Sequence, residues 1–370
     1  MLILGINTGL NASVVLIKDG KAVFGVQEER LSRIKNQPGF PKLAIDYALK
    51  SAKITLKDLD IIAIGGRNSK IALSREDDLN KFHNRYNQIK KKWFGSEITF
   101  FAELVAKAEA GIKKLSQSVA QTPKTLENYL DEIGAEPQKI KKYEHHLCHA
   151  ASAYYGLAKD KHKKYLVFSM DGGGDGKTSA VYIGENGKLT EIASSDSFSP
   201  ACIYAHITYI MGFMPHEHEY KLMGMAPYAQ PKYAKIAKEI LMRFVALDGL
   251  SFTNGPKYPG LRNSQGEVKQ KLVEDLFKSV LNLRFDTLAA GLQLMAEEVA
   301  LQWIKAGVAK TGIKDVLLSG GFFMNVKANK LISELPEIES VNVFPSCGDE
   351  TNAFGAAFLA YNDSAKGEKP

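Results

Sequence analysis

The feature that most constrains this chain is a three-strand pattern that occurs twice, once in each half. In each copy an apolar run is followed by a glycine-containing loop, a second apolar run, a two-residue turn and a third run. The turns are Asp19-Gly20 and Asn186-Gly187, and both dipeptides tolerate the positive φ angles of tight β-hairpins. The pattern predicts strands at residues 2–7, 12–17 and 22–27, and again at 164–171, 178–183 and 189–194.

The loops that join the first two strands of each copy are residues 8–11 and 172–176. Two such units, with helices on their sheets, make up the duplicated ribonuclease-H-like α/β architecture of the actin, sugar kinase and heat-shock chaperone superfamily. Proteins of that class have two lobes and bind nucleotides between them, with the phosphates over the hairpin loops. The alternative is a pair of unrelated hairpins in another α/β protein, since Asp-Gly and Asn-Gly hairpins are common.

At 370 residues the chain exceeds the usual size of a single domain. We expect an N-terminal lobe at 1–160, with a charged helical insertion at about 66–135, and a C-terminal lobe at 161–370. Apolar periodicity and capping signals predict further strands at 61–64 and 316–318 and helices at 41–53, 286–309 and 352–360. Asp286 is the expected N-cap of the second of these helices, and the last helix could return to the first lobe.

The charge balance and the cysteines narrow the class of protein. The net charge of +7 suits anionic ligands such as phosphates. The densest basic stretch, 85–93, is interpreted as a solvated helix face, and nucleic acid is not expected because no compact motif accompanies it. The three cysteines are far apart, which fits a reducing compartment, and no apolar run has the length of a membrane span. We therefore expect a cytoplasmic protein without a membrane partner.

The sharpest local signal is the pair His145 and His149. Residues four apart share one face of a helix, so both imidazoles can bind one metal ion. The alternative is two helix histidines that only form hydrogen bonds. His146 points to a different face, where it could transfer protons beside the metal or simply pack.

Two carboxylates and several glycines stand where ligands commonly bind. Asp171 ends a predicted strand before three glycines, 172–174, where a carboxylate can hold a cation beside a phosphate. Asp349 stands where the last helix begins, and each of these residues could equally serve a turn or a helix N-terminus. Lys221 lies among small and apolar residues, and the segment 319–325 lets backbone N–H groups approach a ligand.

Six segments in this order resemble the O-carbamoyltransferase family that includes NodU and TobZ. They are Ile3-Leu4-Gly5-Ile6-Asn7, Glu28-Glu29-Arg30-Leu31-Ser32-Arg33, 145–154, 219–228, 319–328 and Gly348-Asp349-Glu350. The resemblance implies lobes like those of the threonylcarbamoyl-transferring subunit of the tRNA-modification machinery. It implies a divalent metal ion, most plausibly Fe²⁺, on His145, His149, Asp171 and Asp349.

The resemblance also implies the remaining ligand contacts. Carbamoyl-adenylate, the ATP-derived ligand, is expected to contact Gly172, Gly173, Gly174, Lys221, Gly320, Gly321 and Asn325 or their backbone. His146, Asn11 and Lys35 are the candidates for the catalytic side. The family usually has His-Asp where this chain has Leu10-Asn11, and Lys-His where it has Lys35-Asn36.

The family chain normally continues into a YrdC-like domain that makes the carbamoyl-adenylate, and no segment here resembles it. A YrdC-like adenylating protein acting in trans is therefore an expected partner, and a homodimer is a further possible assembly. The expected function is carbamoyl transfer to a hydroxyl, or an amine, of a small molecule. The alternatives are a degenerate nucleotide- and metal-binding subunit that regulates or scaffolds a partner, and an actin-superfamily kinase or ATPase.

Overall fold

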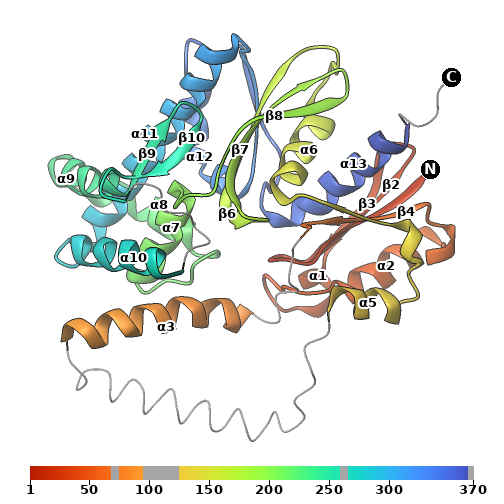
Figure 1. The fold of residues 1–370 in the computed structure, drawn as a ribbon, viewed down its shortest axis with the longest axis horizontal. Coiled ribbons are helices and arrows are strands. Elements are labelled where there is room, and N and C mark those ends of the chain that lie inside the picture. The colour runs from red at the N-terminus through yellow and green to blue at the C-terminus, as the bar shows by residue number, and fades with distance from the viewer. Residues whose placement is uncertain (68–74, 95–124, 259–265, 366–370) are drawn as a thin grey trace, which may run out of the picture.

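The computed structural model describes residues 1–67, 75–94, 125–258 and 266–365. Two five-stranded sheets form the centres of its two lobes (Figure 1). The first sheet has the order β3-β2-β1-β4-β5. Its strands are β1 (Leu2–Asn7), β2 (Ser13–Lys18), β3 (Lys21–Gln27), β4 (Ile61–Gly65) and β5 (Ile140–Tyr143). The first three form an antiparallel meander, and β4 and β5 continue parallel to β1.

The second sheet repeats this topology in the other half of the chain, with the order β12-β11-β6-β7-β8. Its strands are β6 (Tyr165–Gly174), β7 (Lys177–Glu185), β8 (Lys188–Ser195), β11 (Asp315–Ser319) and β12 (Ser340–Val343). Again three strands form an antiparallel meander and the last two run parallel to the first. The protein therefore has the duplicated ribonuclease-H-like architecture that its hairpin pattern predicts.

The hairpin turns explain why the two copies fold alike. Asp19 and Gly20 have φ of 49° and 78°, and Asn186 and Gly187 have φ of 52° and 70°. Positive φ at both central residues is the two-residue turn whose twist matches that of the flanking strands. The six predicted hairpin strands are all present, and their observed bounds differ from the predicted ones by a few residues at most.

Helices cover the sheets. They are α1 (Glu28–Ser32), α2 (Lys42–Ala52), α3 (Arg75–Phe94), α5 (Leu126–Glu132), α6 (His145–Leu157), α7 (Pro200–Ile210), α8 (Glu219–Met225), α9 (Pro231–Leu241), α10 (Gly266–Val280), α11 (Phe285–Thr311), α12 (Val326–Ser333) and α13 (Asn352–Ala365). The described residues also form short 3₁₀ helices: η1 (Leu56–Asp58), η2 (Pro137–Lys139), η3 (Ala226–Tyr228), η4 (Met242–Phe244), η5 (Gly321–Met324) and η6 (Asp349–Thr351). A separate two-stranded sheet pairs β9 (Val245–Asp248) with β10 (Ser251–Asn254). The prediction that Asp286 is an N-cap was wrong, because Arg284 holds that position and Asp286 accepts from the N–H of Thr287 in the first turn.

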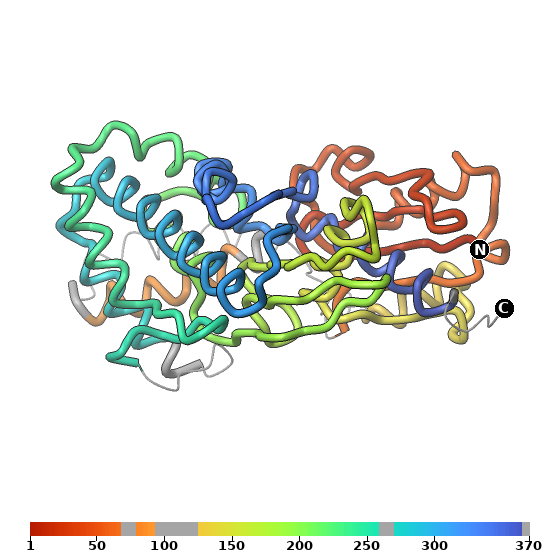
Figure 2. The backbone as a smooth tube through the Cα atoms, turned by 90° about the horizontal axis from the view of Figure 1, so that it is seen from above, coloured from red at the N-terminus to blue at the C-terminus, as the bar shows by residue number. Residues whose placement is uncertain are grey.

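Two helices cross between the lobes and set up the site. Helix α6 follows β5 of the first sheet, yet it packs on β6, β7 and β11 of the second. Helix α13 follows β12 of the second sheet, yet it packs on β1, β2 and β4 of the first, and α6 and α13 pack on each other. Figure 2 shows α13 running into the N-terminal lobe, so that both termini lie at that end. The division at residue 160 stays a prediction, although α6 lies on the second sheet.

The segment expected to be an insertion contributes to both cores. Leu126 and Leu130 of α5 pack into the core of the first sheet. Tyr86 and Ile89 of α3 pack into the core of the second lobe, and both are only 1% exposed. The prediction that residues 85–93 form a solvated face was therefore wrong for these two side chains. Expected insertion residues 68–74 and 95–124 lie outside the described part of the chain.

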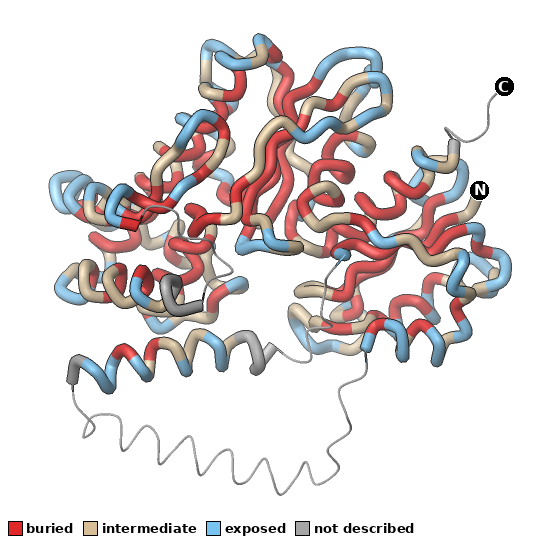
Figure 3. The backbone as a smooth tube through the Cα atoms, viewed as in Figure 1, coloured by how far each residue is buried: buried red, intermediate tan, exposed pale blue. Residues whose placement is uncertain are grey.

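Burial follows the sheets (Figure 3). The central strands β1, β2, β4, β6 and β11 are buried almost throughout, because helices lie on both of their faces. In the described part of the chain, no helix combines the length and the apolar character needed to cross a membrane.

Candidate metal centre and inter-lobe cavity

The N-terminus of α6 is held in place by two carboxylates. Glu144 is the N-cap and accepts from the N–H groups of His146 and Leu147 at 3.0 and 2.8 Å. Asp175, in the loop after β6, accepts from the N–H of His145 at 2.9 Å. Both side chains satisfy N–H groups that a helix leaves without intrahelical partners. The hydrogen bond to Asp175 therefore holds the loop between β6 and β7 against the N-terminus of α6.

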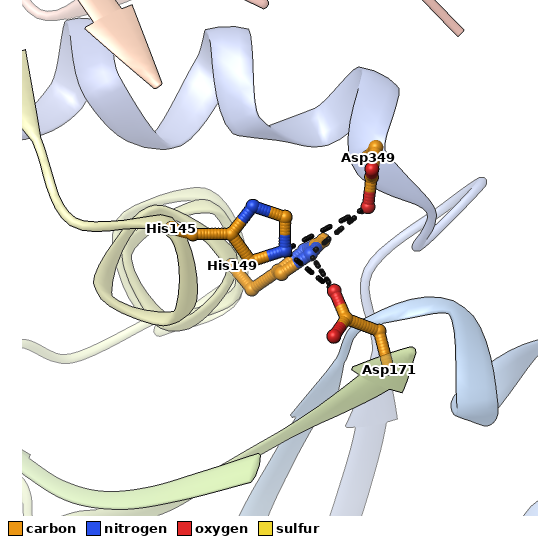
Figure 4. Close-up of side chains that lie close together, drawn as sticks. All are labelled: His145, His149, Asp171 and Asp349. Carbon is orange, nitrogen blue, oxygen red and sulfur yellow. Dashed lines mark hydrogen bonds and ion pairs between the residues drawn. The ribbon is translucent and has the colours of Figure 1, made fainter. Parts of the chain in front are cut away.

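Four predicted metal ligands meet at this point (Figure 4). His145 and His149 come from α6, Asp171 from β6 and Asp349 from η6, and one ligand atom of each lies within 4.8 Å of the others. Asp171 Oδ2 is 2.6 Å from His145 Nε2 and 3.0 Å from His149 Nε2. Asp349 Oδ1 is 3.8 and 3.5 Å from the same two nitrogens. The crossing of α6 and α13 is what brings Asp349 to the histidines.

The donor set fits a divalent transition metal. Ligand bonds of about 2.0–2.2 Å place neighbouring ligand atoms roughly 3.0–3.5 Å apart, close to the separations observed here. Two imidazoles with two carboxylates suit a divalent transition ion such as Fe²⁺ or Zn²⁺ better than Mg²⁺ or Ca²⁺, which prefer oxygen ligands alone.

Asp171 and the neighbouring histidines shift the pKa values of one another. Burial alone would lower the pKa of His145, but the charge of Asp171 and its hydrogen bond outweigh burial and raise the pKa to about 10. Burial likewise opposes ionisation of Asp171, yet the neighbouring histidines hold the pKa of this carboxyl well below its usual range.

His146 lies behind the cluster and does not face the cavity. Its ring is completely buried, its Nδ1 is 2.8 Å from Ser169 Oγ, and burial lowers its pKa to about 4. Its Nε2 is 3.5 Å from Asp171 Oδ1 and has no hydrogen-bond partner among the described residues. A neutral imidazole in this position is placed to support Asp171 from behind.

The glycines of the second hairpin loop divide between two tasks. Gly172 and Gly173 are exposed and line the cavity, and Gly173 donates its N–H to Asp171 Oδ1 at 2.6 Å. Gly174 instead lies against the ring of His145, where a Cβ would come within 2.3 Å of Cγ. Gly174 is therefore required for the position of a ligand residue, and it does not line the cavity.

A cavity of about 500 Å³ opens from the metal centre between the lobes. The predicted residues that line it are Asn11, Asp171, Gly172, Gly173, Gly321, Asn325 and Asp349. Asn11 donates to Glu350 Oε2 at 3.2 Å, and Asn325 exchanges amide hydrogen bonds with Gln293 at 3.0 Å. The structure thus brings together residues from both halves that the sequence places more than 300 positions apart.

His145 and His149 lie behind the two aspartates and are not part of the cavity lining, and three further predicted residues lie outside it as well. Lys35 is 63% exposed and forms an ion pair with Glu217 at 3.1 Å. The Nζ of Lys221 lies over the ring of Phe213, 5.5 Å from its centroid. Gly320 packs on the end of β6, where a Cβ would lie 2.3 Å from Met170 O. The tight approach of β11 to β6 explains the last glycine without a ligand.

Sequence reasoning missed several side chains that line the cavity. From α3 come Lys81, Phe82 and Arg85, and from α7 come Cys202, Tyr204 and His206. Further polar side chains of the lining are His216, Glu217, Glu219 and Tyr220. The spacing of Lys81 and Arg85, one helical turn apart, was the available signal, but it lay in a segment interpreted as an insertion.

Solved structures with similar folds are distant in sequence. Component A of (R)-2-hydroxyglutaryl-CoA dehydratase from Acidaminococcus fermentans aligns over 99% of both chains, with 15% identity and a TM-score of 0.49. HypF of T. kodakarensis aligns over 99% of this chain and 48% of its own, with 14% identity and a TM-score of 0.46.

Sequence relatives are longer than this chain. The nodulation protein NolNO of Sinorhizobium fredii is 26% identical over 95% of this chain and 46% of its own length. An uncharacterized protein of Synechocystis sp. is 28% identical over 99% of this chain and 58% of its own. The chain spans about half the length of these relatives. The family model of the carbamoyltransferase N-terminus matches residues 2–358, and by this match the chain belongs to the carbamoyltransferase family.

Proposed function

We propose that this chain transfers a carbamoyl group from carbamoyl-adenylate to a hydroxyl, or an amine, of a small-molecule acceptor. The observation that carries the proposal is the opening of a two-histidine, two-aspartate cluster into an inter-lobe cavity beside a glycine loop. In such a transfer the acceptor oxygen bonds to the carbamoyl carbon, the bond from that carbon to the phosphate oxygen breaks, AMP leaves with the bonding electron pair, and the hydroxyl proton passes to water.

The residues divide the task as follows. His145, His149, Asp171 and Asp349 would hold the divalent ion, with Fe²⁺ favoured, and a bound ion supplies Lewis-acid polarisation of the donor. Gly172 and Gly173 allow the phosphate to approach the backbone, because neither presents a side chain. The amide of Asn325, held by Gln293, is available to the nucleoside further along the cavity.

Asn11 is proposed to orient the acceptor hydroxyl at the end of the cavity that adjoins the metal ligands. It lines the cavity beside Asp349 and is held by Glu350, so its amide is fixed in direction. An amide orients a hydroxyl by hydrogen bonds but does not take its proton at neutral pH. Lys35 bridges the lobes through Glu217 and would act on the closure of the cavity. His146 would position Asp171.

The decisive test supplies authentic carbamoyl-adenylate to the metal-loaded chain with a panel of sugars and amino sugars. Acceptor-dependent AMP release, together with a carbamoylated product in the mass spectrum, is expected. Asp349→Asn should abolish transfer, whereas Asp160→Asn, which changes an exposed carboxylate, should not. In a second arm, ATP and carbamoyl phosphate should yield product only when a YrdC-like protein is added.

Other outcomes point to the alternatives. Binding of AMP and metal without transfer to any acceptor would favour a nucleotide- and metal-binding subunit. ATP hydrolysis that needs no carbamoyl donor would favour a kinase or ATPase.

A further inference from the structure

Helix α3 is a fixed wall of the cavity. Tyr86 stacks on Tyr209 of α7 with ring centroids 4.9 Å apart, and it meets Phe277 of α10 edge to face at 5.6 Å. The side chain of Gln270 donates to the backbone oxygen of Arg85 at 3.3 Å. Because the opposite face of α3 is packed in this way, the side chains that α3 turns toward the cavity are held on a rigid element.

The cavity face of α3 carries two positive charges. Lys81 and Arg85 are one turn apart on α3, and both line the cavity. Arg85 is partly buried, and among the described residues no carboxylate lies within ion-pair distance of its guanidinium. Desolvation by burial lowers the pKa of Arg85. An anion bound at this face would compensate the charge of the partly buried guanidinium.

His206 lies beside Arg85 and contacts its guanidinium. The Nη1 of Arg85 is 3.4 Å from His206 Nε2, and guanidinium groups only donate. His206 therefore accepts on Nε2 and carries its proton on Nδ1, which is 3.0 Å from Tyr86 Oη. The imidazole orients the guanidinium and adds no negative charge beside it.

Helix α7 separates this face from the proposed nucleoside side. Tyr204 Oη bonds Gln293 at 3.1 Å, and Gln293 holds Asn325, whereas His206, two residues further along α7, contacts α3. Contacts through His216 connect the α3 face with the glycine loop beside the candidate metal centre. The ring of Phe82 is 5.8 Å from that of His216, and His216 lies against Gly172 of the glycine loop.

We infer that the α3 face is the acceptor side of the cavity, and that Arg85 with Lys81 binds a carboxylate or phosphate group of the acceptor. The inference rests on the proposed function and names its substrate class: a hydroxyl compound that also carries an anionic group. Phe82 and His216 line the path from the anionic group to the glycine loop, where the hydroxyl would meet the donor.

The test uses the full chain loaded with metal and saturated with AMP, and titrates sulfate as the probe by calorimetry. Sulfate is expected to bind while AMP stays bound. Arg85→Gln should weaken sulfate about tenfold or more, since a charge-assisted hydrogen bond is lost. Arg85→Lys keeps the charge but loses the guanidinium fork, so it should weaken sulfate less than Arg85→Gln does. Lys90→Gln removes an exposed charge from the same helix and should change nothing. AMP affinity should be equal in all of these proteins.

Lys81→Gln provides a second variant at an exposed position, in case Arg85→Gln does not fold. It should weaken sulfate at least about threefold. Displacement of AMP by sulfate, or loss of AMP affinity in Arg85→Gln, would show that these cations serve the donor phosphate and would overturn the inference. Equal weakening in Lys90→Gln, or no sulfate binding at all, would overturn it as well. In each of these cases transfer from carbamoyl-adenylate can still be measured, so the proposed function is tested separately.

Discussion

Gly355 is a position away from the four candidate ligands where one added methyl group should disturb the candidate metal centre. It lies on α13 where that helix crosses α6, and a Cβ there would be 1.9 Å from the backbone oxygen of Cys148. Real Cβ atoms essentially never come closer than 3.0 Å to such an atom. Gly355→Ala must therefore push α13 away from α6 by roughly an ångström. Overpacking of this kind typically costs about 1–3 kcal/mol, and the better helix propensity of alanine returns less than about 1 kcal/mol.

The displacement acts directly on the ligands. His149 is one residue from Cys148 on α6, and Asp349 begins η6, which leads directly into α13. Ligand distances must hold to about 0.2 Å, so a shift of roughly an ångström should cost at least about tenfold in metal affinity. We expect a lower urea midpoint and weaker metal binding by calorimetry. Both effects should appear together, because one helix crossing produces both.

The matched control is Gly224→Ala on α8, where a Cβ would meet nothing within 4 Å. That variant should be neutral or stabilised by up to about 1 kcal/mol, with unchanged metal affinity. The reasoning is refuted if Gly355→Ala keeps the metal affinity of the parent chain and a midpoint within the error of Gly224→Ala.

Three further outcomes follow from single contacts. His149→Ala should lose most of the bound divalent metal in elemental analysis, while the exposed His162→Ala should keep it; equal metal content would remove the site. Trp303→Ala should cost about 3–5 kcal/mol in urea denaturation, because the fully buried indole also donates to a backbone oxygen; a loss below about 1 kcal/mol would contradict this packing. Burial raises the pKa of Glu28, so its contribution to stability is present at low pH and is lost as the pH rises through the folded-state pKa. Glu28→Gln should therefore flatten the pH dependence of stability above about pH 4.5, and an unchanged slope would show that this carboxyl does not titrate with folding.

Much of the fold could be predicted because it depends on local signals. The Asp-Gly and Asn-Gly turns require positive φ, and their repetition identified both sheets before any contact was known. The shared direction of His145 and His149 could be predicted because residues four apart on a helix lie on one face. The prediction that Asp286 caps this helix was wrong although it rested on a local signal, because the helix begins at Phe285 and Arg284 is its N-cap.

The cavity could not be predicted in the same way. Lys221 stood in a motif that the family resemblance associates with the ligand, yet its ammonium lies over Phe213 outside the cavity lining. Arg85 stood in a segment without a clear apolar pattern, yet it lines the cavity because Tyr86 and Ile89 anchor α3 in the second lobe. Tertiary packing decided both positions.

The sequence by itself determined the two hairpin units, the helix that carries His145 and His149, and the glycine loop that follows Asp171, because backbone sterics and helical periodicity act over a few residues. Only the tertiary structure decided that Asp171 and Asp349 meet those histidines, and that α3 closes the cavity with Arg85. The physical reason is that α6 and α13 each leave the lobe in which they begin and pack on the other sheet. Such an exchange depends on complementary surfaces far apart in the chain, including a glycine small enough to let two helices touch.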